Sequence, residues 1–128
     1  MKELTKAEDQ IMQMLWKLER AFVKEIIEKL PEPKPAYNTV STIIRILEKK
    51  EFVSHEAFGK TFRYYPLISK KEYSKFYLKS FVGNYFSSSY KQMVSFFTKE
   101  ESLSLNEMEE MKKLIELQID IKREAQNG

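Results

Sequence analysis

The chain has 128 residues, a net charge of +3, a single histidine and no cysteine. These counts exclude disulfide frameworks, thiolate metal sites, cysteine nucleophiles and histidine-rich metal sites. Apolar residues make up 42% and charged residues 32%, which is typical of one globular domain, or of one small domain with an extension. No run approaches the ~20 apolar residues of a membrane span, and the charged N-terminus has no signal-peptide core. We therefore expect a cytoplasmic protein that holds no metal and no cofactor.

The charge is unevenly distributed along the chain. Residues 67–98 contain five basic residues and one acidic residue, whereas residues 99–128 contain five and eight. This balance allows nucleic-acid binding through a local basic patch but does not require it.

A first amphipathic helix is predicted near the N-terminus. Thr5 and Glu8 have the spacing of a capping box, and apolar residues recur at helical spacing over residues 7–18. We expect this helix to end near Lys17 and residues 18–22 to form a short connector.

A second apolar stripe, over residues 22–30, predicts another helix that ends at Pro31. Residues 31–35 contain three prolines, which remove backbone amides and fix φ. No helix crosses this stiff connector.

The third predicted helix, from Ala36 or Tyr37 to about Lys50, has a short polar outer face. Its core face consists of Val40, Ile43, Ile44 and Leu47. Opposite or flanking positions carry Asn38, Thr39, Ser41, Thr42, Arg45 and Lys49. Asn, Ser and Thr are poor helix formers, so their use on an exposed face suggests a partner that approaches the backbone closely. These side chains and Arg pair with base edges or phosphates, whereas the alternative interpretation is a tolerated polar face next to a turn.

A β-hairpin is predicted after this helix. Residues 52–56 and 61–65 have the composition of two short strands. Residues 57–60 connect them, and Gly59 is available there for a positive φ.

Two basic residues of the hairpin are candidate phosphate contacts, Lys60 at the tip and Arg63 on the second strand. Three helices followed by a hairpin predict a winged helix-turn-helix. This order is common in DNA-binding domains and also occurs in protein-interaction modules.

Aromatic residues are dense between Tyr64 and Phe97, and lysines lie among them. Interleaved basic and aromatic residues can indicate a site for single-stranded nucleic acid. Here the apolar residues recur at helical spacing, which favours a buried helix interface. Gly83–Asn84 and Ser87–Ser89 predict a kink or break, followed by a short helix over residues 90–97.

Ser104 and Glu107 have the spacing of a second capping box, and the last predicted helix runs from Leu105 to about Arg123. The C-terminal half has no sheet and little material for a core of its own. We expect two copies to pack together, and folding back on the winged helix is the alternative. The residues expected at the dimer interface are Tyr73, Phe76, Tyr77, Phe81, Tyr85, Phe86, Met108, Met111 and Ile115.

The predicted fold is therefore mainly α with a small antiparallel β wing. Residues 1–68 are expected to form a winged-helix DNA-binding domain, and residues 69–128 a helical dimerisation region.

Three segments carry a family resemblance: residues 4–16 (LTKAEDQIMQMLW), residues 37–53 and residues 58–73. With the pattern Thr-Val-x-Thr…Arg-x-Leu-x-x-Lys over residues 39–50, they resemble the penicillinase-repressor (BlaI/MecI/CopY) family of bacterial transcription repressors. The resemblance covers nearly the whole chain. Glu51 stands where the family usually has glycine.

The resemblance implies a homodimer that binds a palindromic operator in double-stranded DNA, with the third helix of each protomer in a major groove. Mapped onto this chain, the groove-facing candidates are Asn38, Thr39, Ser41, Thr42 and Arg45. Lys60 and Arg63 are the candidates in the wing. Thr42 and Arg45 are our candidates for base readout, and the others for phosphate contacts.

The resemblance also implies a release mechanism. Antibiotic-responsive members of the family are inactivated by a membrane-embedded zinc metalloprotease sensor that cuts the C-terminal half at an Asn-Phe pair. The matching pair here is Ser95–Phe96, which lacks the asparagine. Copper-responsive members carry a C-terminal cysteine cluster, so copper sensing by that route is excluded and the inducing signal is open.

We do not expect an enzyme. His55 lies in a predicted strand without a recognisable Ser or Cys nucleophile, so we interpret it as a surface or packing residue, and no phosphate-cradling glycine loop occurs. One rival interpretation is a winged-helix module that binds protein. Another is a ligand-sensing repressor whose aromatic C-terminal half encloses a small hydrophobic molecule, although packing between protomers explains these residues more simply.

Overall fold

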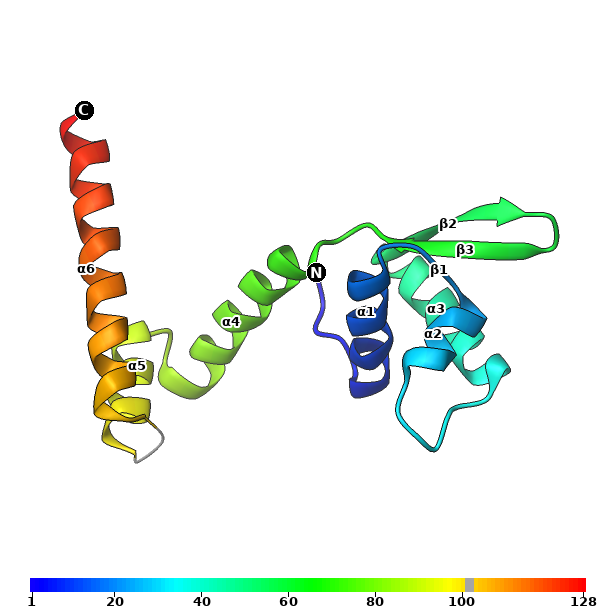
Figure 1. Cartoon of the computed structure of the whole chain (residues 1–128), viewed down its shortest axis with the longest axis horizontal. Helices are drawn as coiled ribbons and strands as arrows, with labels where there is room; N and C mark the ends of the chain where they lie inside the picture. The colour runs from blue at the N-terminus through cyan, green and yellow to red at the C-terminus, as the bar shows by residue number, and fades with distance from the viewer. Residues whose placement is uncertain (101–102) are drawn as a thin grey trace. The chain divides into compact units, whose positions relative to one another are not determined.

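The computed structural model describes residues 1–100 and 103–128. It forms two compact units, Met1–Leu78 and Lys79–Gly128, whose labelled elements are drawn in Figure 1. The first unit contains a three-stranded antiparallel sheet with strand order β1-β3-β2. The predicted mainly α fold with a small β wing is confirmed, but the division between the units lies later than the predicted boundary after residue 68.

Helix α1 (Lys6–Leu18) begins with the predicted capping box. The Thr5 hydroxyl accepts a hydrogen bond from the Glu8 amide at 3.2 Å, and the Glu8 carboxylate accepts one from the Thr5 amide at 2.8 Å. These bonds satisfy amides that a helix start leaves without helical partners. The face that α1 buries includes Ile11, Met12 and Leu15.

A short strand, β1 (Ala21–Phe22), lies where the sequence predicts only a connector over residues 18–22. It pairs antiparallel with β3 (Thr61–Pro66). Two residues are too few to show the period-2 alternation that identifies a strand. Helix α2 (Val23–Lys29) therefore begins one residue later than predicted.

One lysine ties down the proline-rich connector between α2 and α3 (Tyr37–Lys49). The Lys34 ammonium donates hydrogen bonds of 2.8 to 3.2 Å to the carbonyl groups of Ile27, Glu28 and Leu30. The end of a helix leaves such carbonyls unpaired and carries partial negative charge, so the cation caps α2.

Helix α3 buries the face that its sequence predicts. Val40, Ile44 and Leu47 are no more than 1% exposed, and Ile43 is half-buried at the edge of this face. The opposite side of α3 is therefore the side available to a partner.

The exit from α3 uses a left-handed backbone at Glu51, with φ of +65°. The Phe52 amide donates to the Leu47 carbonyl at 2.9 Å, and Phe52 then enters the core at 1% exposure. The family that this chain resembles usually has glycine at this position. Glycine adopts this conformation without a side-chain clash. Glu51 keeps the same backbone path at a cost of about 1 kcal/mol or more.

A partly buried ion pair joins α1 to the end of α3. The Glu8 side chain is 5% exposed, and the Lys50 ammonium lies 2.8 and 3.1 Å from its two oxygens. Burial raises the pKa of Glu8, but the hydrogen bonds from Lys50 and Thr5, together with the Lys50 charge, outweigh burial. The pKa of Glu8 therefore lies below its ordinary value of 4.5.

The wing consists of β2 (Val53–Phe58) and β3, joined by a turn at Gly59 and Lys60. Gly59 has the positive φ that such a turn requires, +62°. The strands are longer than the predicted residues 52–56 and 61–65, and the turn is shorter. The difference arises because backbone pairing continues to the turn whatever side chains the strands carry.

Helix α4 (Lys70–Phe86) begins inside the first unit. The Tyr73 hydroxyl accepts a hydrogen bond from the Leu4 amide at 2.8 Å. The Tyr73 ring lies 6.0 Å from that of Trp16 and 5.9 Å from that of Phe52, between centroids. Tyr73 is 7% exposed and belongs to the winged-helix core.

Two residues predicted at the dimer interface are thus placed elsewhere. Tyr73 is part of the core of the first unit, and Phe76 packs against that core. The Trp16 indole donates to the Ile68 carbonyl at 2.8 Å and fixes the chain just before α4. An apolar helical stripe looks the same whether it covers its own domain or a second protomer, so the sequence could not separate these residues from the rest of the stripe.

The second unit contains the remainder of α4, together with α5 (Tyr90–Lys99) and α6 (Leu105–Asn127). The predicted break is confirmed: Ser87 and Ser88 have φ of +51° and +63° and end α4.

Helix α6 begins with the second predicted capping box, formed by Ser104 and Glu107, and continues past the predicted end at Arg123. Among the described residues of this unit, only Val82 of α4 is buried. The unit therefore has almost no core of its own.

Candidate nucleic-acid interface

The outer face of α3 exposes most of the side chains predicted to face a DNA groove. The exposed residues are Asn38, Thr39, Thr42, Arg45 and Lys49. Ser41 differs, because it is 8% exposed and points to the side of the helix. Five polar or basic side chains on one helix face offer donors and acceptors without a protein layer above them.

The Thr42 hydroxyl already makes one hydrogen bond within α3. Its hydroxyl donates to the Asn38 carbonyl at 2.8 Å, one turn earlier in α3. The hydroxyl oxygen retains its lone pairs and the methyl group stays exposed. Thr42 can therefore accept a hydrogen bond from a base edge or contact a thymine methyl group.

Arg45 is held by a single neutral partner. Its Nη2 donates to the Ser41 hydroxyl at 3.3 Å, and the other guanidinium donors have no protein partner among the described residues. Ser41, predicted as a groove contact, is therefore placed to orient Arg45. Arg45 keeps enough donors to bind a guanine edge bidentately.

The two predicted phosphate contacts of the wing have different surroundings. Lys60 is exposed in the turn. Arg63 Nη2 lies 3.7 Å from a Glu56 carboxylate oxygen, and the guanidinium stacks over the Phe58 ring at 4.7 Å. Arg63 is therefore engaged within the wing, and a DNA contact by Arg63 stays a prediction.

The pleat of β3 explains the position of Arg63. Neighbouring side chains of a strand point to opposite faces, so Phe62 and Tyr64 lie on one face and Arg63 on the other. On the Arg63 face, Arg20 also pairs with Glu56. The sequence predicted a strand here but not which of its faces meets α3.

Glu48 and His55 connect α3 to the wing. His55 Nδ1 and the Glu48 carboxylate are in hydrogen-bond contact, and the imidazole lies 4.3 Å from the Phe62 ring, between centroids. His55, predicted to be a surface or packing residue, packs between α3 and the wing. Burial, followed by the Glu48 charge, raises the pKa of the adjacent Tyr64, which is 4% exposed, so its phenol stays neutral.

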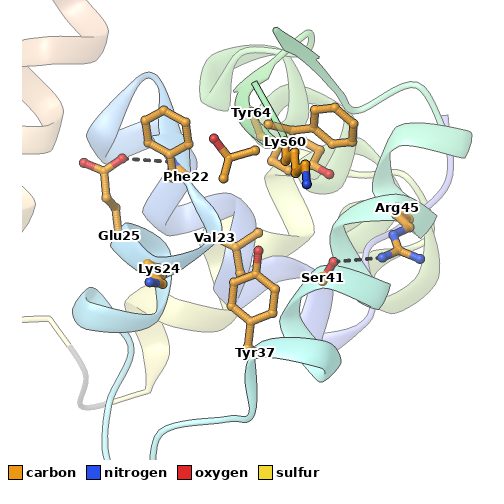
Figure 2. A pocket seen from close by; sticks show the side chains of 11 residues that line it. Phe22, Val23, Lys24, Glu25, Tyr37, Ser41, Arg45, Lys60 and Tyr64 are labelled. Atoms are coloured by element: carbon orange, nitrogen blue, oxygen red, sulfur yellow. Dashed lines mark hydrogen bonds between the residues drawn. The ribbon is translucent and has the colours of Figure 1, made fainter. Parts of the chain in front are cut away.

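A cavity of about 560 Å³ lies between the start of α2, the side of α3 and strand β3 (Figure 2). Aromatic and aliphatic side chains make up much of its lining, namely Phe22, Val23, Tyr37, Phe62 and Tyr64. Three cations stand around it, Lys24 of α2, Arg45 of α3 and Lys60 of the wing.

Lys24 and Tyr37 are residues of this surface that the sequence did not single out. Lys24 is exposed and Tyr37 is 49% exposed. They come from two helices and meet the wing only in the folded chain, so no sequence spacing marks them. The one available pattern is the one-turn spacing of Tyr37, Ser41 and Arg45 along α3.

The remaining residues predicted at the dimer interface form the apolar surfaces of the C-terminal helices. Tyr77, Tyr85 and Ile115 are 48%, 73% and 50% exposed. The half-buried ones are Phe81, Phe86, Met108 and Met111. Ring contacts of Phe81 with Phe86 and of Phe86 with Phe96, at 5.8 and 5.7 Å, hold the chain at the break.

Helix α6 carries two apolar stripes. Met108, Met111 and Ile115 face α5 and line a cavity of about 260 Å³ with Val94 and Thr98. A second stripe points away from this contact and consists of Leu114, Leu117 and Ile121, exposed at 57%, 55% and 48%. One helix neighbour cannot cover both stripes.

The predicted cleavage pair lies inside helix α5. Ser95 is half-buried and Phe96 is 57% exposed. A protease that needs an extended substrate would have to open this helix first.

Within residues 1–100 and 103–128, no group of three or more His, Cys, Asp or Glu residues could hold a metal ion. Over the same residues, no helix has the length and apolar character to cross a membrane.

The family model described as penicillinase repressor matches residues 4–117. The chain belongs to the penicillinase repressor family. The resemblance carried by the sequence is thereby confirmed. Members of this family are winged-helix, DNA-binding transcriptional repressors and are generally not enzymes, which agrees with the exposed polar face of α3.

Two relatives of this penicillinase repressor family member match over both units. The methicillin resistance regulatory protein MecI of Staphylococcus aureus (strain N315) is 28% identical over 114 residues, which is 88% of this chain and 93% of MecI. The penicillinase repressor of Bacillus licheniformis is 26% identical over 123 residues, which is 95% of this chain and 96% of that protein.

Two solved structures match part of the chain. The solution structure of the DNA-binding domain of the repressor BlaI is 28% identical, with a TM-score of 0.49, and covers 57% of this chain and 94% of that chain. The CopR repressor structure is 36% identical, with a TM-score of 0.44, and covers 53% and 100%.

Proposed function

We propose that this penicillinase repressor family member represses transcription as a homodimer on a palindromic operator, with α3 of each protomer in a major groove. The observation that carries the proposal is the outer face of α3, where polar and basic side chains are exposed opposite the buried residues Val40, Ile44 and Leu47. Such a face fits the width of the major groove of B-DNA. As a DNA-binding repressor it would act in the bacterial cytoplasm.

In this proposal, Arg45 and Thr42 are the residues that contact base edges. Arg45 has free guanidinium donors for a guanine edge, and Thr42 offers an acceptor and a methyl group. The exposed residues assigned to phosphates, which set the register on the duplex, are Asn38, Thr39, Lys49 and Lys60.

Titration of labelled DNA from the chain's own upstream region, followed by fluorescence anisotropy, tests this assignment. Arg45→Ala should weaken operator binding by about tenfold to a hundredfold and leave binding to scrambled DNA nearly unchanged. Lys60→Ala should weaken both alike and reduce the salt slope by about 0.9.

Arg123→Ala, which removes the same charge from α6, is the control and should leave binding unchanged. An operator affinity that is unchanged in Arg45→Ala would contradict the assignment of α3 as the helix that contacts the bases. A chain with no affinity for the DNA at all would favour the rival class, a winged-helix module that binds protein.

We also propose that the second unit forms the dimer. Its helices leave apolar side chains exposed, Tyr85 and Phe96 among them, and α6 has one stripe more than α5 can cover. A second copy would bury this surface and place two α3 helices on two half-sites.

Light scattering on the full chain tests dimerisation. Leu117→Asp places a charge on the apolar stripe of α6 that α5 does not cover and should shift the chain to monomer, because an unpaired charge in an apolar interface is costly. Arg123→Gln makes the same change in net charge at a polar position of α6, away from both apolar stripes, and should stay dimeric. Monomeric wild-type protein at micromolar concentration would contradict the proposal.

We propose that the repressor is released from the operator by proteolysis. A membrane-embedded metalloprotease sensor would cut the chain between Ser95 and Phe96. A cut there would separate α6 from the rest of the chain and remove the avidity of two linked DNA-binding units. Mass spectrometry of the chain from antibiotic-treated cells should find a fragment that ends at Ser95. An intact chain during derepression would contradict this route.

A further inference from the structure

The cavity between α2, α3 and the wing has the size of a small-molecule site. Its volume is about 560 Å³, within the ~300–1,000 Å³ typical of ligand pockets. All its walls belong to the first unit, which has its own core. The cavity therefore exists before any partner binds.

The walls of the cavity would suit a flat apolar ring. Val23 and Tyr64 are 5% and 4% exposed, so they form a fixed floor. The rings of Tyr37 and Phe62 are 49% and 43% exposed beside it, and the contact with His55 steadies Phe62. Offset or edge-to-face stacking between such rings and an aromatic ligand is favourable.

The charges around the cavity would suit an anion. Lys24, Arg45 and Lys60 approach it from three elements, as Figure 2 shows. Within the described part of the chain, none of the three forms a salt bridge. Glu25 is the one carboxylate of the lining, and it accepts a hydrogen bond from the Phe22 amide at 2.8 Å. Three cations against one engaged carboxylate leave a local positive charge.

From this geometry we infer that the cavity binds a small aromatic anion, and that its occupation releases the operator. The inference rests on the proposed function and adds a regulatory ligand to the same face. A phosphodiester backbone crossing the mouth could meet the cations, but it has no ring to place against Tyr64 and Val23. An aromatic carboxylate satisfies both the cations and the apolar floor.

Competition with DNA follows from shared residues. Arg45 is the proposed base reader and Lys60 a proposed phosphate contact, and both line the cavity. A bound anion would engage both cations and leave them unavailable to the operator. By linkage, operator binding must weaken ligand binding by the same factor.

The test uses benzoate and 2-naphthoate as probes on the isotopically labelled full chain. Amide spectra should show saturable shifts at Tyr37, Lys60 and Phe62, with a Kd for benzoate on the order of 1 mM and tighter binding for the larger ring. Benzamide has the ring without the charge, and acetate has the charge without the ring. At equal ionic strength, both should bind at least about tenfold more weakly.

Two matched variants of α2 locate the site. Lys24→Gln removes a cation of the cavity and should weaken probe binding several-fold, whereas Lys29→Gln removes an equal charge outside the lining and should not. With labelled operator, 2-naphthoate should raise the apparent operator Kd of wild type and of Lys29→Gln, and raise it much less for Lys24→Gln.

Several results would overturn the inference: no saturable shift with either probe, equal shifts with benzamide or acetate, or equal probe binding by Lys24→Gln and wild type. If Lys24→Gln weakens operator binding while the probes do not bind, the cavity belongs to the DNA interface instead. If the chain binds no operator, the proposed function fails, and the spectra still decide whether the cavity binds the anion.

Discussion

The two units of the chain use similar amphipathic helices with opposite results. In Met1–Leu78, apolar side chains from four helices and a sheet meet in one core, where Met12, Leu15 and Ile26 are fully buried. In Lys79–Gly128, the described helices leave side chains such as Leu114 and Leu117 more than half exposed. An amphipathic stripe therefore shows that a helix must be covered, but not by which element.

This difference has an energetic consequence. The first unit buries enough apolar surface to hold its own fold, whereas the second has Val82 as its buried side chain among the described residues. We expect the first unit to unfold independently of protein concentration and the second to depend on a partner.

The largest effect is expected from a cavity in the first core. Phe52→Ala should lower the free energy of unfolding of the winged-helix unit by about 3–5 kcal/mol, since Phe52 is 1% exposed. Urea unfolding followed by the fluorescence of Trp16, the single tryptophan, reports on this unit. Phe96→Ala, at a position 57% exposed in the other unit, should leave the Trp16 transition unchanged. Equal shifts for the two variants would remove the distinction between the units.

The second-largest effect is expected from dilution, which should destabilise the second unit but not the first. If a second copy covers the C-terminal helices, a hundredfold dilution should cost the dimer about 2.7 kcal/mol of stability. Thermal unfolding by circular dichroism should then show a helical transition that moves to lower temperature on dilution, while the Trp16 transition stays in place. If the midpoint temperatures of both unfolding transitions do not change with protein concentration, the second unit is stable without a partner.

A smaller, pH-dependent effect is expected at Glu8. The fold lowers the pKa of this carboxyl, so the stabilisation is present above the unfolded pKa near 4.5 and is lost as pH falls through the folded value. Glu8→Gln keeps a capping side chain and should cost about 1–2 kcal/mol at neutral pH, limited because the Lys50 side chain is 33% exposed.

The measurement is urea unfolding of Glu8→Gln and wild type at neutral pH and at about pH 3, where the two stabilities should converge. Glu28→Gln, at an exposed position of α2, is the control and should follow wild type at both values. A gap that persists unchanged in acid would show that the ion pair with Lys50 is not the cause.

The smallest effect is expected at the exit of α3. Glu51→Gly should raise stability by up to about 1 kcal/mol, because glycine removes the strain of a φ of +65° but gives the unfolded chain more freedom. Gln10→Gly, inside α1, should instead lower stability by about 1 kcal/mol. Loss of stability in Glu51→Gly as large as in Gln10→Gly would mean that Glu51 makes a compensating contact.

Much of the fold could be predicted because its determinants are local. The capping boxes at Thr5 and Ser104, the glycine turn of the wing and the break at Ser87–Ser89 each depend on a few neighbouring residues. The identity of β1 could not be predicted, because its two residues become a strand only through pairing with β3.

The surface proposed to bind DNA was predictable in part for the same reason. The outward residues of α3 follow from helical periodicity, as Asn38 and Thr42 illustrate. The engagement of Arg63 by Glu56 and the approach of Lys24 to the wing depend on strand pleat and on the packing of separate segments. Local spacing contains no information on either.

By itself, the sequence determined the order of helices and hairpin, the polar outer face of α3 and membership of a repressor family. The first two depend on periodicity, capping and turn chemistry, which act over a few residues, whereas the family membership rests on the matched motifs. Only the tertiary structure decided that Tyr73 belongs to the winged-helix core, that Arg63 faces away from α3, and that three cations surround an aromatic cavity. Those facts require long-range packing, in which one apolar stripe has several possible partners and a single geometry selects among them.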